Sequence, residues 1–176
     1  MRKEIYLIKG LEKESYIDFI ERIISLSKSL TKNKETEEIK LSLTIKPPPR
    51  FSIIPFKKDK IAALSLNHLG KDFNEELILE KGFSGTFYVN EALPVYYEKN
   101  WPDLQATPGV CLLTLFRQKH GIDYDTFIHR WHNSHTPLSL KIHPLWNYNR
   151  NVVKGGHPAN INHWDGIVEE QFRTQS

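Results

Sequence analysis

The chain carries two similar segments, and this internal similarity limits its fold more than any other feature of its 176 residues. The segment YIDFIER at 16–22 matches YDTFIHR at 124–130, which is a shift of 108 positions. The same shift places the alternating apolar pattern at 39–45, which is typical of a strand, on residues 147–153. Strand patterns also precede both helical segments at this shift. We therefore expect an internal duplication.

The first half of the chain predicts the order strand, helix, strand, strand, helix, strand. Alternating branched and aromatic residues indicate strands, and apolar residues that recur every three or four positions indicate helices. The predicted elements are strands at 4–9, 39–45, 60–67 and 84–97, the last broken at Pro94, and helices at 14–30 and 73–80. Three prolines at 47–49 predict a stiff extended connection, because proline lacks an amide hydrogen. This order is that of a ferredoxin-like unit.

Transferred to the second half, the same order predicts a second unit that is incomplete. Its third strand is expected at 163–172, and the sequence ends at Ser176, before a last helix and strand. The fold class we expect is α+β, with two tandem ferredoxin-like units at 1–100 and 101–176. Either the chain is clipped, or the missing edge is supplied by the first unit or by another subunit. An open strand edge favours pairing, so we expect a homo-oligomer such as a dimer.

The composition argues against several classes of protein. The 24 Lys and Arg residues against 21 Asp and Glu leave a net charge of +3, and the lysines are scattered, so no nucleic-acid interface is expected. No apolar run approaches the roughly 18 residues that span a bilayer, and the first residues do not resemble a signal peptide. We expect a soluble cytoplasmic protein with no membrane partner. The one cysteine, Cys111, lies in the apolar run VCLLTLF and is expected to be buried.

The most informative stretch is a predicted helix in the second half. Asp123 is expected to cap it, because a short carboxylate can accept a hydrogen bond from a first-turn amide. Phe127, Trp131 and His135 recur every fourth residue and so share one helix face. Thr136–Pro137 should interrupt the helix and start a new segment with the threonine as its cap, because proline suits a first turn. A histidine is thus expected at a helix end, next to two aromatic rings.

This region resembles the signature of the EthD-like family, named for a protein of ethyl tert-butyl ether degradation. The matching residues are Arg117, Gly121, Phe127, Trp131, His135, Pro137, Tyr148, Trp164, Asp165, Gly166 and Glu169. The resemblance implies ferredoxin-like units whose antiparallel sheets pair into an α/β barrel around a cavity for a small, mostly apolar or aromatic molecule. Members and relatives of this group of barrels include monooxygenases without a metal, cyclases, dehydratases and decarboxylases.

His135 is the leading candidate for acid–base catalysis, because imidazole is the side chain that titrates near neutral pH. The duplicate has Ser27 at the corresponding position, so we expect a single site, in the second unit. Asp165 or Glu169 is expected to orient the histidine, and Tyr148 to donate a hydrogen bond to a substrate oxygen. The residues expected to contact the substrate are Trp131, Arg117 and Phe127.

Other interpretations of these residues stay open. His135 can instead bond the last carbonyls of its helix, and Trp131 and Tyr148 can belong to the core. His129, His132 and His135 are spaced by three residues, which does not align them on a helix of 3.6 residues per turn. No carboxylate completes the set, so no metal site is expected.

The function we expect is that of an EthD-like enzyme that performs acid–base chemistry on a small apolar or aromatic substrate. Cyclases, dehydratases, decarboxylases and cofactor-free oxygenases are the types that the resemblance implies, and no cofactor is expected. One alternative is a non-catalytic ligand-binding or accessory protein. A second alternative is a haem-binding barrel in which a histidine serves as axial ligand.

Overall fold

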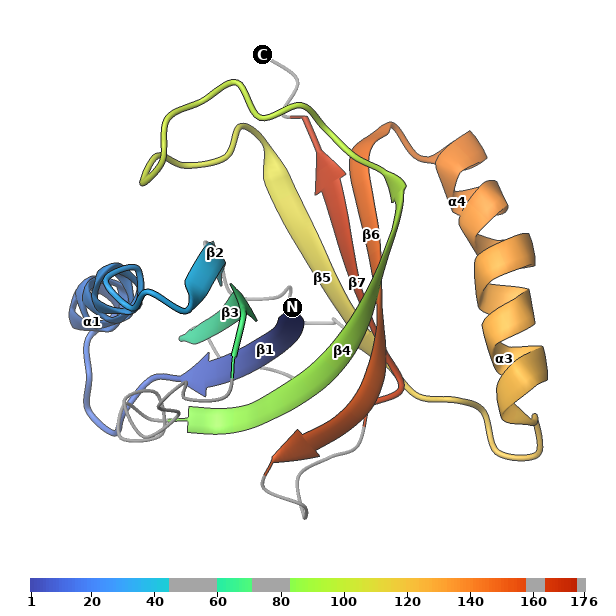
Figure 1. Cartoon of the computed structure of the whole chain (residues 1–176), viewed down its shortest axis with the longest axis horizontal. Helices are drawn as coiled ribbons and strands as arrows, with labels where there is room; N and C mark the ends of the chain where they lie inside the picture. Colours follow the sequence, from blue (N-terminus) through green and yellow to red (C-terminus); the bar gives the residue numbers. More distant parts are fainter. Residues whose placement is uncertain (45–59, 71–82, 158–163, 174–176) are drawn as a thin grey trace. The chain divides into compact units, whose positions relative to one another are not determined.

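The computed structural model describes residues 1–44, 60–70, 83–157 and 164–173 (Figure 1). The predicted proline connection at 47–49 and the predicted helix at 73–80 lie outside these ranges. The fold is α+β with a mostly antiparallel sheet of seven described strands, which confirms the predicted class. Among the described residues, no helix has both the length and the apolarity needed to cross a bilayer.

The chain divides into two compact units. Unit 1 comprises Met1–Val89 and Gly155–Ile161, and unit 2 comprises Asn90–Lys154 and Asn162–Ser176. The boundary falls within a long strand, β4 (Phe83–Val95), whose first part belongs to unit 1 and whose last part belongs to unit 2.

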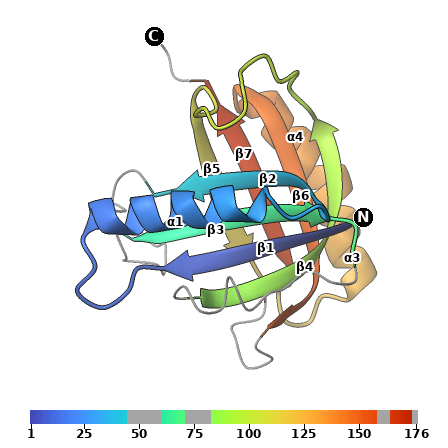
Figure 2. The same cartoon turned by 60° about the vertical axis from the view of Figure 1, so that its left-hand side comes forward.

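Unit 1 has one helix beside four strands in its described part. Its elements are β1 (Arg2–Lys9), α1 (Tyr16–Leu30), β2 (Thr36–Leu43), β3 (Ile61–His68) and the first part of β4. Strand β3 pairs antiparallel with β1 and β2, and β1 also pairs antiparallel with β4, so the strand order is β2-β3-β1-β4. The helix α1 lies along β2 and β3 (Figure 2). The first three predicted strands and the first predicted helix are confirmed, with ends that differ by a few residues.

The core of unit 1 lies between α1 and one face of this sheet. The helix contributes residues three or four positions apart, namely Phe19, Ile23, Leu26 and Leu30. The strands contribute alternate residues, among them Tyr6, Ile8, Leu64 and Leu66. Removal of these apolar side chains from water holds the helix on the sheet.

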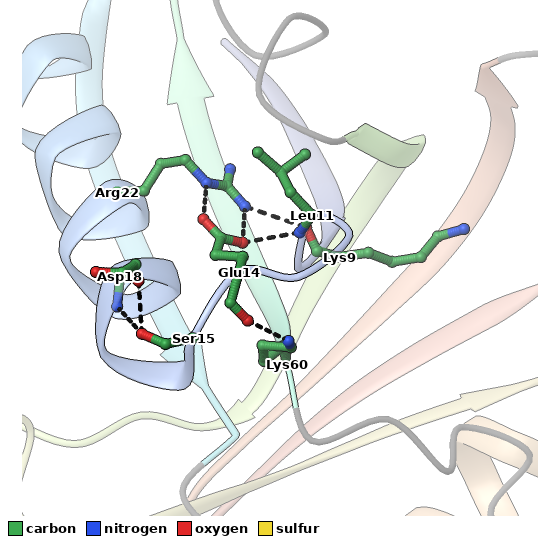
Figure 3. A network of polar contacts seen from close by, with 7 residues as sticks. All are labelled: Lys9, Leu11, Glu14, Ser15, Asp18, Arg22 and Lys60. Carbon is green, nitrogen blue, oxygen red and sulfur yellow. Dashed lines mark hydrogen bonds and ion pairs between the residues drawn. The ribbon is translucent and has the colours of Figure 1, made fainter.

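A polar network joins the end of β1, the start of α1 and the start of β3 (Figure 3). The Arg22 guanidinium donates two hydrogen bonds to the Glu14 carboxylate, at 2.6 and 2.9 Å. The guanidinium also donates to the backbone oxygen of Lys9 at 3.3 Å. The Lys60 ammonium donates to the backbone oxygen of Glu14. The hydrogen bond from Arg22 lowers the pKa of Glu14 below its usual value. Ser15 caps the helix, because its Oγ accepts a first-turn amide at 3.1 Å.

Unit 2 has three consecutive helical segments beside its strands. Its elements are the last part of β4, β5 (Val110–Phe116), α3 (Tyr124–Arg130), the π-helical η1 (Trp131–His135), α4 (Thr136–Ile142), β6 (Leu145–His157) and β7 (Gly166–Phe172). Strand β7 pairs antiparallel with β5 and β6, and the strand order is β4-β6-β7-β5. The helical segments lie along one face of these strands (Figure 1). The core on that face contains Trp131, Tyr148, Val152 and Val168.

The helical stretch of unit 2 begins as predicted, and a new segment, α4, starts at Thr136 as predicted, but without the expected interruption. Asp123 caps α3, because its Oδ1 accepts a hydrogen bond from the amide of Thr126 at 2.8 Å. The predicted cap at Thr136 is wrong. Thr136 has helical backbone angles, and its hydroxyl donates to the carbonyl of Trp131 at 2.8 Å. The π-turn η1 therefore leads into α4 without an interruption.

The proline after Thr136 is accommodated by a side chain from strand β6. In a π-turn each amide bonds to the carbonyl five residues earlier, so residue 137 would bond to His132. Pro137 has no amide hydrogen for this bond. The Nη1 of Arg150 donates to the carbonyl of His132 instead, at 3.3 Å. A guanidinium thus donates to the carbonyl that the proline leaves without an amide partner.

Three further expectations are corrected by the structure. Strand β4 continues through Pro94 and ends at Val95. Strand β7 begins at Gly166, so Asp165 precedes the strand instead of lying in it. Cys111 is exposed rather than buried, as are its neighbours Val110 and Leu112 at the start of β5.

Candidate functional site

Three asparagines form a row on strand β6 of unit 2. Asn147, Asn149 and Asn151 occupy alternate positions, so their side chains lie on the same face of the sheet. Tyr148, which lies between the first two, points to the opposite face and belongs to the core beneath the helices. The asparagine row therefore lies on the face away from the helices.

The asparagine row lies beside a glutamate of the neighbouring strand β7. The register of the two strands places Glu169 opposite Asn149 and diagonal to Asn151. The Nδ2 of Asn149 donates to Oε2 of Glu169 at 2.8 Å, and the Nδ2 of Asn151 donates to the same oxygen at 3.0 Å. Asn149 also donates to the carboxylate of Glu91 on β4. We name these four residues, Glu91, Asn149, Asn151 and Glu169, the Glu169 cluster.

Three of the four residues of the Glu169 cluster are buried, and Glu91 is exposed. Asn149 and Asn151 have no exposed surface, and Glu169 is 5% exposed. A buried polar group costs free energy unless it is hydrogen-bonded, and a buried carboxylate costs more. Two amide donors on one oxygen offset this cost, because hydrogen bonds to an ionised group are among the strong ones. The two asparagines therefore hold the Glu169 carboxylate in one orientation.

Two acceptors of the cluster have no hydrogen-bond partner in the described part of the chain. They are Oδ1 of Asn149 and Oδ1 of Asn151. Most buried polar side-chain atoms in proteins have a partner, which is a protein group or an ordered water. Orphaned acceptors therefore mark positions where a donor from a ligand or a water can bind. The cluster offers a carboxylate base and two neutral acceptors next to each other.

The structure does not bring the predicted pair His135 and Glu169 together. His135 is exposed, and its Nε2 lies 3.3 Å from the hydroxyl oxygen of Ser139. A π-turn contains about one residue more than an α-turn, so Thr136 rather than His135 comes to lie below Trp131. His135 thus lies in the helical layer, whereas Glu169 lies on the opposite face of the sheet.

The aromatic residues that were expected at the substrate belong to the core on the helix side. Trp131 is 4% exposed and packs edge-on against Phe116, with 4.7 Å between the ring centroids. Phe127 lies next to Trp131, with 5.8 Å between the centroids. Tyr148 is 1% exposed and belongs to the same group. These rings hold the helices on the sheet, on the face away from Glu169.

Asp165 and Arg117 lie where β5 ends and β7 begins. The Oδ2 of Asp165 accepts a hydrogen bond from the backbone amide of Gln118 at 2.7 Å, and the Asp165 amide donates to the carbonyl of Phe116 at 3.0 Å. The Arg117 guanidinium lies 5.1 Å from the centre of the Trp164 ring. These contacts join the end of one strand to the start of the other.

A second polar group lies on the helix side of β6. Arg150 donates to Oγ1 of Thr136 at 3.3 Å, in addition to its bond with the carbonyl of His132. Burial lowers the pKa of His132, and the nearby charge of Arg150 lowers it further. Burial also lowers the pKa of Arg150. This group keeps a neutral histidine next to a cation. Within the described ranges, no three side chains of metal-binding type come together.

The asparagine row was not among the predicted site residues, although the sequence carries a signal for it. The run NYNRN at 147–151 alternates asparagine with larger side chains inside a predicted strand, which places a polar row on one face. Glu91 has no comparable signal. It reaches the row only because β4 is the neighbour of β6 in the sheet.

Comparison with known proteins does not identify the chain. No model of a protein family matches it, and no curated protein is significantly similar to it. The resemblance to the EthD-like family therefore stays a prediction. The function has to be inferred from the geometry of the Glu169 cluster.

Proposed function

We propose that the Glu169 cluster binds a small molecule and that Glu169 transfers a proton on it. The observation that carries this proposal is the single carboxylate oxygen that accepts two buried amide donors, from Asn149 and Asn151. A catalytic base must be held within hydrogen-bond reach of the proton that it removes. The two amides supply this positioning, and burial limits the access of bulk water.

The reaction that fits best is proton transfer at a carbon next to a carbonyl group. The Glu169 carboxylate takes the proton of the C–H bond and becomes a carboxylic acid, while the electron pair of that bond stays on the substrate as an enolate. The acid then returns the proton to another atom of the substrate, and the carboxylate is restored. Isomerisation and cyclisation can proceed in this way. When the proton is returned to a hydroxyl oxygen, water leaves and the reaction is a dehydration.

Glu91 is the second carboxylate of the site. The amide of Asn149 donates to both Glu91 and Glu169, so this side chain links the two acids. A pair of carboxyl groups in one site lets one group take a proton while the other gives one. We assign the acid–base role first to Glu169 and second to Glu91, and the positioning role to Asn149.

The resemblance to EthD-like proteins supports the class of reaction, because it implies acid–base enzymes of small apolar or aromatic molecules without a cofactor. In our proposal the base is Glu169 instead of His135, because His135 is exposed and lies on the other side of the sheet. The orphaned oxygens of Asn149 and Asn151 also fit a protein that binds a ligand without turning it over. Hydrogen–deuterium exchange on a bound compound distinguishes an enzyme from a binding protein.

We further propose that the two units are tandem ferredoxin-like repeats. Both units run strand, helix, strand, strand, and in both the third strand lies between the other two, as β2-β3-β1 and β6-β7-β5. Helices α1 and α3 begin at Tyr16 and Tyr124, a shift of 108 positions, and each follows a side-chain cap. The expected barrel and the expected dimer depend on this proposal and stay predictions.

Hydrogen–deuterium exchange at an activated C–H bond tests the proposed function. A panel of small 1,3-dicarbonyl compounds and aromatic ketones is followed by NMR in heavy water, with and without the protein. Glu169→Gln keeps the size of the side chain and an acceptor oxygen but removes the base. We expect catalysed exchange to fall by about 100-fold or more. The matched control is Glu170→Gln, the next residue of β7, which points to the other face and should leave exchange unchanged.

The outcomes of this experiment separate the two functions. Full exchange activity in the Glu169→Gln variant would exclude Glu169 as the base. If a compound of the panel binds to the wild type but its C–H bond does not exchange, the ligand-binding alternative is favoured. Circular dichroism of each variant checks that the fold is intact.

A further inference from the structure

The Glu169 cluster contains two buried carbonyl oxygens that need a donor. Neither Oδ1 of Asn149 nor Oδ1 of Asn151 has a hydrogen-bond partner among the described residues, and both side chains are 0% exposed. An acceptor that leaves water without gaining a donor raises the free energy of the folded state. Two such acceptors on one face of one strand indicate a shared reason for their presence.

The orientation of both amides follows from the carboxylate beside them. Each Nδ2 donates to Oε2 of Glu169, at 2.8 Å from Asn149 and 3.0 Å from Asn151. The reverse orientation would place a carbonyl oxygen against a carboxylate oxygen, and two acceptors repel each other. The carbonyl oxygens are therefore the ends of the amides that do not bond to Glu169.

The spacing of the two acceptors follows from the strand. Asn149 and Asn151 are two residues apart on β6, so their Cβ atoms are separated by roughly 7 Å. Asn147 occupies the next position in the row, but its Nδ2 donates to the carbonyl of Val95 at 3.2 Å instead of to Glu169. The pair of orphaned acceptors next to the base is thus limited to Asn149 and Asn151.

We propose that Asn149 and Asn151 select a small molecule that carries two hydroxyl groups, one donated to each Oδ1. This inference rests on the proposed function in one respect, which is that the Glu169 cluster is the ligand site. Neutral amide oxygens suit neutral hydroxyl donors, whereas an ammonium group would bond preferentially to the carboxylates of Glu91 and Glu169. A dihydroxylated ligand satisfies both buried acceptors and leaves the Glu169 carboxylate next to its carbon skeleton.

The test compares ligands that differ only in their donors, on the unmodified protein. Resorcinol and 2,7-dihydroxynaphthalene are titrated by NMR or calorimetry together with their dimethyl ethers, which keep the ring and lack the donors. A site that is built to bond a hydroxyl rejects the analogue without it, so we expect each diol to bind at least about tenfold more tightly than its ether. In Asn149→Ala and Asn151→Ala the preference for the diol should fall by a similar factor. The matched control Asn147→Ala should retain it.

Equal affinity of the wild type for diol and ether would overturn the inference, because ordered water alone would then satisfy the two oxygens. The same conclusion would follow if folded Asn149→Ala and Asn151→Ala kept the full preference. Failure here can be distinguished from failure of the proposed function. If the wild type prefers diols but catalyses no C–H exchange, the selection of hydroxyl groups stands and the enzyme assignment falls. If exchange depends on Glu169 but diols bind no more tightly than their ethers, the enzyme assignment stands and the selection of hydroxyl groups falls.

Discussion

Asn149 and Glu169 face each other across strands β6 and β7, and a hydrogen bond of 2.8 Å joins the amide of one to the carboxylate of the other. The same amide also donates to Glu91. Two acids that would otherwise repel each other are therefore connected by one neutral donor. A charged side chain at position 149 should therefore disturb this arrangement strongly.

Asn149→Asp should destabilise the protein strongly at neutral pH. The change replaces a donor with a third carboxylate in a buried position, so we expect a loss of about 3 kcal/mol in the free energy of unfolding. The loss should become smaller in acid, where carboxylates take up protons. Urea unfolding at two pH values measures both effects. Asn133→Asp, at an exposed position of the helical face, should change stability little. Similar losses at both positions would contradict the role of Asn149.

Gly166→Ala should loosen the contact between the helices and the sheet of unit 2. A Cβ at this position would lie 2.4 Å from Cζ of Phe116 and 2.8 Å from Cη2 of Trp131. Overpacking of this kind costs about 1–3 kcal/mol in the free energy of unfolding. Gly155→Ala is the control, because among the described residues its Cβ would meet only Tyr88, at 3.8 Å. A thermal shift that is the same for both variants would show that the rings can move aside.

Protonation of His132 should make stability fall in mild acid. Burial and the neighbouring charge of Arg150 lower its pKa in the folded state, whereas in the unfolded chain it titrates near its usual value of about 6.5. Below about pH 6.5 the unfolded state binds the proton first, so stability is lost as the pH falls further towards the folded pKa. His132→Gln should reduce this loss between pH 8 and pH 5. The exposed His120→Gln should leave the profile as it is in the wild type.

The contribution of Arg150 should depend on Pro137. Arg150→Met removes the donor to the carbonyl of His132, and we expect a cost of about 2 kcal/mol in the free energy of unfolding. In a Pro137→Ala background the new amide hydrogen can bond to that carbonyl, so the same change should cost about 1 kcal/mol less. A double-mutant cycle by chemical denaturation measures this coupling. Additive effects would mean that the guanidinium does not replace the missing amide.

The Glu14 carboxylate should titrate closer to its usual range when Arg22 is removed. Two hydrogen bonds from Arg22 favour the ionised form and lower the pKa of Glu14 in the folded protein. This stabilisation is present above the usual glutamate pKa and is lost as the pH falls through the folded value. In Arg22→Ala an NMR titration should show a higher pKa for Glu14, with a loss of about 1 kcal/mol at neutral pH. The exposed Lys28→Ala should leave that pKa unchanged.

In the helical stretch of unit 2, residue spacing predicts the buried face correctly for some side chains and wrongly for another. Phe127 and Trp131 lie on one face, as their spacing predicts, and both pack against the sheet. The pattern fails for His135, because the π-turn inserts an additional residue and brings Thr136 to the position below Trp131. Spacing along the sequence assumes 3.6 residues per turn, so it cannot predict where a turn is wider.

The sequence alone predicted most of the described strands and helices, and the start of α3 after its cap at Asp123, because periodicity and capping act over a few residues. Only the tertiary structure decided which side of the sheet the asparagines of β6 occupy and which acids they meet. That side is set by the inclusion of Trp131 and Tyr148 in one core, and the meeting of Asn149 with Glu169 is set by strand register. Both depend on contacts between residues far apart in the chain, which no local pattern encodes.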